Sequence, residues 1–522
     1  MHLRSLLPAV LFLVGPAMLL AGEWKLDVVH LKNGTRLTGL IVEERKDAVL
    51  FKYVVRRAGT RTLVIDTQLD PAEISRIDRL PEPERKELRQ RLAQLDRDGE
   101  GEKKRMAAVD LRFEKASPLG GPAWRYTGQY FDLLSNARED IVRRVIVRLE
   151  DIFRAYTERL GTRHRPERRT QVVLYKTRPE YQAALKEAGL KILNPAYYDP
   201  AANRIVAASD LERWADELDE LRRKHDQVLR ELEDQEQKLR RHFHGQPPAA
   251  LVAQLRDIRR NIQLLNSENE AAFERLHRPL FATLFHEAFH AYLDNYVYPS
   301  ATHAVPRWLN EGLAQIFETA LVETGELRIG HVDKDRLAAV QEAVRKKQLV
   351  PLEELLAAEP KHFSVAHVSE AQASDRYFQT AWALAYYLTF DRKLLGTKAL
   401  DAYVESGRRG VAPVAAFRTL VGQPLPEFEA EFHRYILRLL PDGTLKSEPK
   451  CPHSRAGGAP TSPGAGAGVS AAGATPGGGC SGWLFVPVLL APWELRCGRC
   501  GRWGRCGGSK SLVARRLRQK RM

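Results

Sequence analysis

Alternating apolar and polar positions near the N-terminus predict a small β-structure. Residues 27–42 contain two alternating runs around Asn33-Gly34, a dipeptide typical of two-residue hairpin turns. Further strand-like runs follow at Ala48–Val55 and Thr62–Ile65. Several short strands within 23–80 predict a small SH3-like or Sm-like β-barrel. Such barrels bind many kinds of ligand, so this region by itself assigns no function.

The next stretch predicts a charged linker followed by mixed secondary structure. Residues 81–106 are dense in charged side chains and predict a helical linker. Apolar residues at helical spacing predict a helix over 140–160. Two short apolar runs, Gln171–Tyr175 and Asn203–Ala208, predict buried strands. We expect Asn203–Ala208 to be the edge strand that pairs with an extended peptide.

The clearest periodicity in the chain lies in residues 211–276. Mostly apolar positions repeat at alternating spacings of three and four on either side of a Gly- and Pro-containing break. The pattern predicts an antiparallel coiled-coil hairpin, inserted as residues 209–276. Polar His225, Gln235 and Asn269 fall in the predicted seam, where they reduce stability and fix the register. We expect a structural arm; the alternative is a contact with a protein partner, or self-association, through this hairpin.

Residues 277–440 are predicted to be mostly helical. Together with the preceding strands they predict an α+β fold, in which a mostly helical domain, 107–440, contains a small mixed sheet. The composition changes after residue 440, because Gly, Ala, Pro and Ser dominate 456–479. Such a composition cannot bury enough apolar surface to fold, so 441–522 is predicted to be a disordered, basic tail.

Net charge and cysteine are concentrated in this tail. Residues 441–522 contain 13 Lys and Arg but only 3 Asp and Glu, so they hold 10 of the 15 net positive charges. The basic pI is therefore a property of the tail and does not indicate that the folded part binds a specific nucleic acid. All 5 cysteines also lie there, beginning at Cys451. A metal site in the body must consequently use His, Asp or Glu.

Residues 1–22 have the three parts of a secretory signal peptide. Arg4 provides a positive start, Leu6–Leu20 is an apolar run, and Ala21-Gly22 offers small residues for cleavage. The apolar run is short for a membrane span. We therefore expect an exported chain, located in the periplasm, the cell envelope or the extracellular space, with no transmembrane span after cleavage.

One helical stretch contains the residues typical of a hydrolytic zinc site. His286 and His290 are four positions apart, so on a helix both imidazoles face one side and reach one ion. Glu287 follows the first histidine and can take a proton from a water that zinc acidifies. Twenty residues separate His290 from Glu311, which begins a second helical stretch. We expect His286, His290 and Glu311 to bind one zinc ion and to leave a fourth position open.

The elements His286-Glu-x-x-His290 and Trp308-Leu-Asn-Glu311-Gly resemble the gluzincin metallopeptidases, above all their M1 aminopeptidase-like branch. In that branch the glutamate of the Asn-Glu-Gly element is the third zinc ligand, so the resemblance implies the same role for Glu311. More loosely, residues 107–440 resemble the peptidase-MA-like domain of exported bacterial proteins of unknown function.

Further residues match the gluzincin pattern one by one. Glu318 and Asn295 match a glutamate and an asparagine that recur in it. Tyr377-x-x-x-Ala resembles the element whose tyrosine stabilises the oxyanion, so the resemblance implies this catalytic role for Tyr377. The alternative is that Tyr377 is a half-buried core residue. Asp294, one turn after His290, is a candidate to orient a ligand histidine, and an exposed helix acid is the alternative.

Two classes of function remain open at this point. The Gly-x-Met-Glu-Asn element that binds a free amino terminus in M1 aminopeptidases is absent from the sequence. An endopeptidase acting on a peptide or protein substrate is therefore favoured over an aminopeptidase. The alternative is a non-catalytic cell-envelope binding protein, which would keep the same fold as a scaffold and use the β-barrel and the hairpin for partners.

Overall fold

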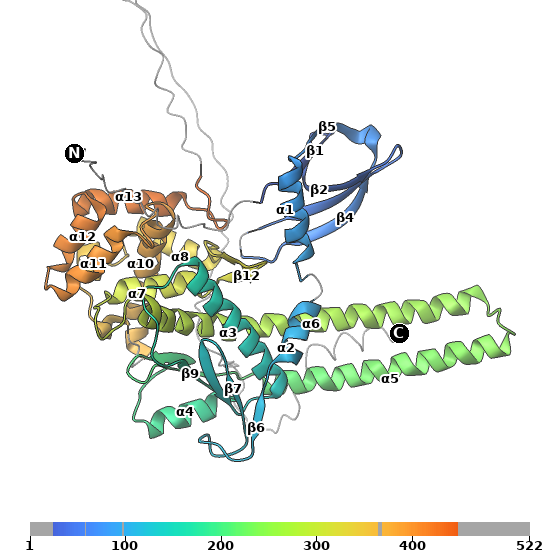
Figure 1. The fold of residues 1–522 in the computed structure, drawn as a ribbon, viewed down its shortest axis with the longest axis horizontal. Helices are drawn as coiled ribbons and strands as arrows, with labels where there is room; N and C mark the ends of the chain where they lie inside the picture. The colour runs from blue at the N-terminus through green and yellow to red at the C-terminus, as the bar shows by residue number, and fades with distance from the viewer. Residues whose placement is uncertain (1–23, 58, 97–98, 364–367, 447–522) are drawn as a thin grey trace, which may run out of the picture. The chain divides into compact units, whose positions relative to one another are not determined.

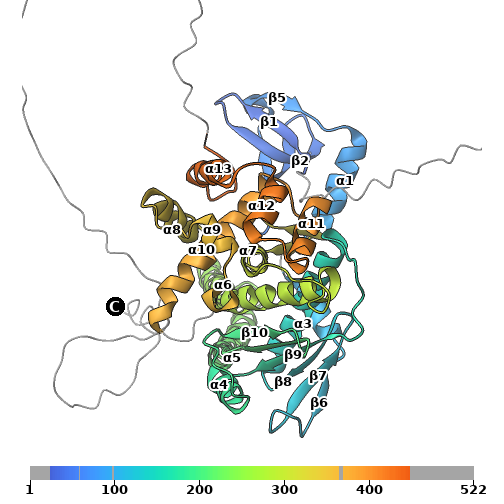
Figure 2. The same cartoon turned by 90° about the vertical axis from the view of Figure 1, so that its left-hand side faces the viewer.

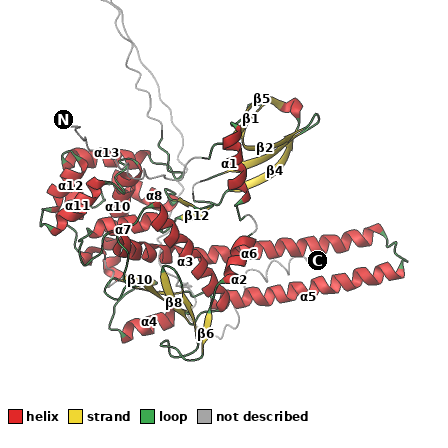
Figure 3. Ribbon diagram, in the orientation of Figure 1, coloured by secondary structure: helices red, strands yellow, loops and turns green. Residues whose placement is uncertain are grey.

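A computed structural model describes residues 24–57, 59–96, 99–363 and 368–446. Helices predominate in it and small sheets accompany them, as Figures 1 and 3 show, so the predicted α+β class is confirmed. The described residues all belong to one unit, Met1–Pro449. The expected signal peptide, 1–22, and residues 447–522 of the expected tail lie outside the described residues.

The N-terminal strands form an open, five-stranded antiparallel sheet with the order β4-β3-β2-β1-β5. The strands are β1 (Asp27–Leu31), β2 (Arg36–Glu44), β3 (Val49–Val55), β4 (Leu63–Leu69) and β5 (Ile74–Asp78), with a 3-10 turn at Pro71–Glu73. Closure into a barrel would require β4 and β5 to pair, and they stand at opposite edges. The predicted small barrel is therefore not closed in the structure, and the SH3-like or Sm-like assignment stays a prediction.

Two helices form from the charged segment that follows this sheet. They are α1 (Glu82–Ala93) and α2 (Glu100–Ala108). α1 buries Leu88 and Leu92 against a small apolar cluster that includes Trp24. α2 contributes Glu102, whose carboxylate accepts hydrogen bonds from Arg148 of the next helix. α1 is thus packed against the N-terminal sheet, and α2 against the helix that follows it.

A mixed six-stranded sheet opens the larger domain, with the order β10-β11-β9-β8-β7-β6. β8, β9 and β11 are parallel neighbours and the other pairs are antiparallel. The strands are β6 (Arg112–Glu114), β7 (Ala123–Thr127), β8 (Phe131–Ser135), β9 (Thr170–Tyr175), β10 (Ala196–Asp199) and β11 (Arg204–Ala208). Asn203–Ala208 was expected to be an edge strand. That prediction is wrong, because β11 lies between β9 and β10, and β10 is the edge.

Helices cover both faces of this sheet, as the view in Figure 2 shows. Side chains alternate along β11: Ile205 and Ala207 join the main core with α6, whereas Val206 and Ala208 pack with α4. The two helices connecting the parallel strands are α3 (Glu139–Arg159) and α4 (Arg178–Glu187). Strand β11 is therefore buried on both faces of the sheet, by α6 on one face and by α4 on the other.

The predicted helical hairpin is present as two antiparallel helices, α5 (Glu212–His242) and α6 (Ala249–Tyr292), which lie side by side in Figure 1. α6 continues without a break from the hairpin into the segment with both candidate histidines. Nδ1 of His225 and Oδ1 of Asn266 lie 2.5 Å apart and set the register. Gln235 is exposed rather than in the seam, so the prediction for this residue is wrong.

The rest of the described chain is a helical assembly that shares one apolar core with α3, α6 and the six-stranded sheet. Its helices are α7 (Arg307–Phe317), α8 (Lys334–Arg345), α9 (Leu352–Leu356), α10 (Val368–Phe390), α11 (Lys398–Arg408), α12 (Pro413–Val421) and α13 (Leu425–Arg438), and a β-hairpin, β12 (Leu321–Glu323) and β13 (Glu326–Arg328), follows α7. Among the helices of the described residues, none has the length and apolar character that a membrane crossing requires.

Candidate metal centre

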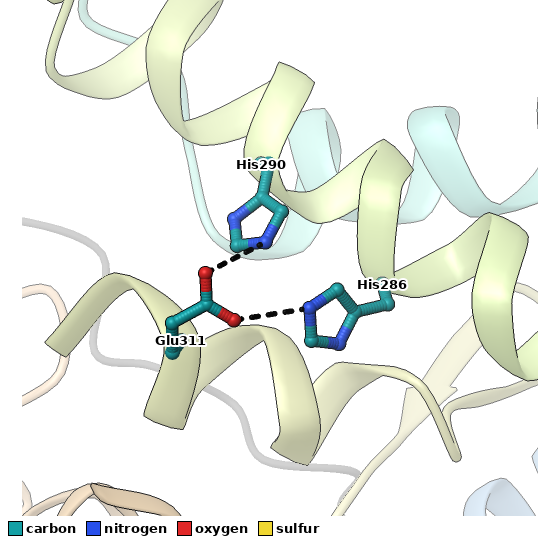
Figure 4. Close-up of side chains that lie close together, drawn as sticks. All are labelled: His286, His290 and Glu311. Carbon is teal, nitrogen blue, oxygen red and sulfur yellow. Dashed lines mark ion pairs between the residues drawn. The ribbon is translucent and has the colours of Figure 1, made fainter. Parts of the chain in front are cut away.

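Two helices bring the predicted ligands together. His286 and His290 lie one turn apart on α6, with ring centroids 4.7 Å apart, and Glu311 faces them from α7 (Figure 4). Nε2 of His286 lies 3.3 Å from Oε2 of Glu311, and Nε2 of His290 lies 3.6 Å from Oε1 of Glu311. One donor atom from each of the three residues falls within 4.8 Å of the others. The carboxylate therefore closes a compact three-ligand cluster.

These distances suit a tetrahedral metal site. Zinc lies about 2.0–2.2 Å from nitrogen and carboxylate oxygen ligands, which places two ligands of a tetrahedron about 3.4 Å apart. The nitrogen–oxygen distances of 3.3 and 3.6 Å lie on either side of this value. Two imidazoles and one carboxylate are also the donor set of catalytic zinc sites that keep one position open. The residues present thus fit one zinc ion.

Close packing between α7 and α10 sets the position of Glu311. The next residue, Gly312, faces α10 so closely that an added Cβ would lie 2.4 Å from the carbonyl oxygen of Ala381 and 2.8 Å from Cβ of Ala385. Both obstacles are rigid, so only glycine permits this approach of the two helices. The Asn-Glu-Gly element therefore has a structural reason for its glycine as well as for its glutamate.

Hydrogen bonds on the far side of each imidazole direct Nε2 towards Glu311. Nδ1 of His290 lies 2.8 Å from Oδ1 of Asn310, and Nδ1 of His286 lies 3.3 Å from Oε2 of Glu318. Since both oxygens accept hydrogen bonds, a proton on each Nδ1 satisfies them, and a metal would take the place of any proton on Nε2. Arg336 of α8 in turn donates to Glu318 over 2.6 Å. The role of Asn310 was missed in the sequence, although it directly precedes Glu311.

Asp294 does not orient either histidine, so that prediction is wrong. A single π-helical turn, Leu293–Val297, follows α6 and directs Asp294 towards the sheet. There its carboxylate accepts hydrogen bonds from the hydroxyl of Tyr198 at 2.8 Å and from the backbone of Ser300 at 2.6 Å. Asn295, matched to the gluzincin pattern, donates to Asn203 over 2.8 Å. Both residues therefore fasten the end of the histidine helix to β10 and the start of β11.

Burial and neighbouring charges shift the pKa values of the three candidate ligands in different directions. Burial opposes ionisation of Glu311, but the histidines and Arg307 outweigh it and lower its pKa to about 2. Nη2 of Arg307 lies 2.7 Å from Oε1 of Glu311. Burial lowers the pKa of His290 to about 4, so this imidazole is neutral at neutral pH. For His286 the hydrogen bonds to Glu311 and Glu318 outweigh burial and raise the pKa to about 10.

Glu287 is placed on the side of α6 that faces the edge strand. Burial raises the pKa of its carboxyl to about 7, against the opposing effect of the neighbouring His286. The backbone N–H of Tyr198, in β10, also favours the ionised carboxylate. A carboxyl with this pKa can accept and release a proton near neutral pH.

Tyr377 has a partner of its own in the structure. Its hydroxyl donates a short hydrogen bond to Glu354 of α9, and its ring stacks on His362 at a centroid distance of 4.9 Å. Burial and the bond to Glu354 raise the pKa of Tyr377 to about 12. The hydroxyl is therefore committed to a carboxylate rather than to the three-ligand cluster.

Comparison with known proteins finds a similarity to a family without an assigned function, over the part of the chain that contains this cluster. Residues 280–405 are similar to a family described as "Protein of unknown function (DUF1570)". The matched region includes His286, Glu287, His290, Glu311 and Tyr377. No curated protein matches the chain.

Proposed function

We propose that this protein is an exported zinc-dependent peptidase of the gluzincin type. The observation that supports the proposal is the convergence of two imidazole nitrogens and one carboxylate, at distances that suit a single ion, beside the buried carboxyl of Glu287. The secretory pattern in residues 1–22 supports export.

Each residue of the site has a role in this proposal. Zinc held by His286, His290 and Glu311 would act as a Lewis acid and lower the pKa of a water in the open position. Glu287 is the general base: it takes a proton from the attacking water and then donates it to the leaving amine. The oxyanion role that the gluzincin resemblance implies for Tyr377 requires its hydroxyl to leave Glu354, and the proposal does not depend on it.

The edge strand supports a peptide substrate. β10 packs along α6 and has one sheet neighbour, β11, so its other side is the edge of the sheet beside Glu287. An extended peptide that added to this edge would present its backbone carbonyls next to the general base. An internal stretch of a chain can bind in this way, which favours an endopeptidase.

Metal content of the purified protein is the first test. We expect close to one zinc per chain, and a large loss of zinc in Glu311→Ala. Since two histidines and one carboxylate also hold ferrous iron in other proteins, the measurement must include iron. Iron in place of zinc, or a folded protein that takes up no metal when zinc is supplied, would contradict the proposal.

Hydrolysis of a peptide library is the second test. We expect Glu287→Gln to keep its zinc and to lose at least about 100-fold in rate, because the general base is gone. Glu268→Gln, an exposed substitution on the same helix, is the matched control and should retain full activity. Full activity in Glu287→Gln would refute the proposed mechanism, whatever the metal content.

A further inference from the structure

The outer part of the helical hairpin has a defined register. His225 and Asn266 meet across the two helices, and nearer the tip Glu236 lies 3.6 Å from Arg259. The buried seam consists of Leu232 and Ile262 with neighbours at spacings of three and four. Because the helices are antiparallel, the two residue numbers of each facing pair add up to nearly the same value. A residue on α5 therefore lies at the same height along the hairpin as the α6 residue whose number completes that sum.

A second apolar row runs beside this seam and is not covered by it. The row is made of four residues with exposed fractions of 37–43%, which we call the hairpin stripe: Val228, Leu251, Ile258 and Leu265. Each lies immediately before a seam position, and in an antiparallel pair of helices such positions fall on the same side. The other side of the seam instead has Asp226, Glu233, Arg240, Arg256, Gln263 and Glu270. On α6 this face is thus apolar, whereas on α5 it combines Val228 with exposed Gln235 and His242, and the opposite face of the hairpin is mostly charged.

We propose that the hairpin stripe is a dimer interface, in which the hairpins of two copies of this chain pack face to face and antiparallel. The spacing of the stripe on α6 supports a second copy as the partner. Leu251 and Leu265 lie seven residues before and seven residues after Ile258. A two-fold axis at Ile258 therefore places Ile258 against its own copy and Leu251 against Leu265 of the other chain, as an isologous interface requires.

The polar residues that border the stripe complement one another under the same axis. On α6, Gln254 comes opposite Asn261 of the other copy, and these two exposed amides can exchange hydrogen bonds. On α5, the level of Ile258 corresponds to Gln235, so exposed Glu231 comes opposite exposed Lys238. Both borders thus join compatible groups, and one of them joins opposite charges.

The size of the face also suits a dimer. The stripe and one turn at each end span about 30 Å of helix, and two helices side by side are about 20 Å wide. The face therefore offers about 600 Å² per chain, or about 1,200 Å² in total, at the lower end of specific interfaces. The apolar run Trp483–Leu490 of the tail is a poorer occupant, because it is eight residues long, contains Pro487 and has no seven-residue repeat.

Sedimentation analysis of the full chain over a range of concentrations tests the interface. We expect a reversible dimer, and at least a 100-fold weaker association in Ile258→Glu, because two buried carboxylates would meet at the axis. Ile258 is 43% exposed, so the variant should keep its helix content by circular dichroism. Gln263→Glu, on the charged side of the same helix, is the matched control and should remain dimeric.

A charge exchange tests the antiparallel arrangement separately. Glu231→Lys and Lys238→Glu should each weaken the dimer, and the double variant should restore it, because the opposite charges then meet again across the axis. A parent chain that is monomeric at every concentration would overturn the proposal, as would a dimer that survives Ile258→Glu. A double variant no tighter than the single ones would overturn the antiparallel packing. These readouts need neither zinc nor catalysis, so they stand apart from the proposed peptidase activity.

Discussion

Replacing Gly312 by alanine should damage both the fold and the metal site. The new Cβ would lie 2.4 Å from the carbonyl oxygen of Ala381, and ordinary contact begins at about 3.4 Å. Relief of this overlap requires α7 and α10 to move apart by about 1 Å. Glu311 is adjacent on α7, and metal–ligand distances tolerate only about 0.2 Å. We therefore expect Gly312→Ala to lose most of its zinc.

The expected loss of stability follows from two opposing effects. Overpacking typically costs about 1–3 kcal/mol, and a backbone carbonyl cannot rotate away, so we take about 3 kcal/mol. Alanine is favoured over glycine within a helix by about 1 kcal/mol. The net destabilisation is about 2 kcal/mol, which corresponds to a fall in Tm of about 3 °C for a domain of about 330 residues.

Gly407 in α11 provides the matched control. A Cβ there would meet only the carbonyl oxygen of Ala304, at 3.4 Å, so Gly407→Ala keeps the helix preference and lacks the overlap. Thermal unfolding of the metal-free proteins and zinc titration of each variant are the measurements. If Gly312→Ala unfolds at the same temperature as the parent or higher, as Gly407→Ala should, then the packing argument is refuted.

Two further predictions concern charged side chains. Glu318→Gln should weaken zinc binding about 10-fold to 100-fold, measured by competition with a chelator, because the amide can turn its N–H₂ towards Nδ1 of His286 and favours the wrong tautomer. Unchanged affinity would contradict this role. Glu102 has a lowered pKa because its ion pair with Arg148 outweighs burial, so its contribution to stability is present above about pH 4.5 and is lost as the pH falls. Glu102→Gln should accordingly lower stability by about 3 kcal/mol at pH 7 and by clearly less at pH 3; an equal deficit at both pH values would refute it.

The candidate site was largely predictable because its signals are local. Two histidines four residues apart on an apolar helical stretch can only face the same side, and the structure places them so. Glu311 was predicted from its helical position and from the resemblance, and it does complete the cluster. The sequence did not predict that Asn310, rather than Asp294, lies next to a ligand histidine. Which polar neighbour bonds to Nδ1 depends on the angle between α6 and α7 and on the π-helical turn after α6, and neither is encoded in the spacing.

The hairpin shows a similar limit at the level of packing. Two adjacent apolar rows on α6 satisfy the same alternation of three and four, because a helix has 3.6 residues per turn. The sequence predicts that the two helices pair, but not which row is buried between them. The structure buries the row with Leu232 and Ile262 and leaves the row with Val228 and Ile258 exposed.

The sequence alone therefore determined the class of fold, the existence of the hairpin and three of the residues that meet at the candidate metal centre. These are consequences of periodicity and of short spacings along one helix. Only the tertiary structure decided that the N-terminal sheet stays open, that β10 is the edge strand, and that Tyr377 bonds to Glu354. Each of these depends on contacts between segments far apart in the chain. The hydrophobic effect that drives such contacts is non-directional, so the pattern of apolar residues does not specify which segments meet.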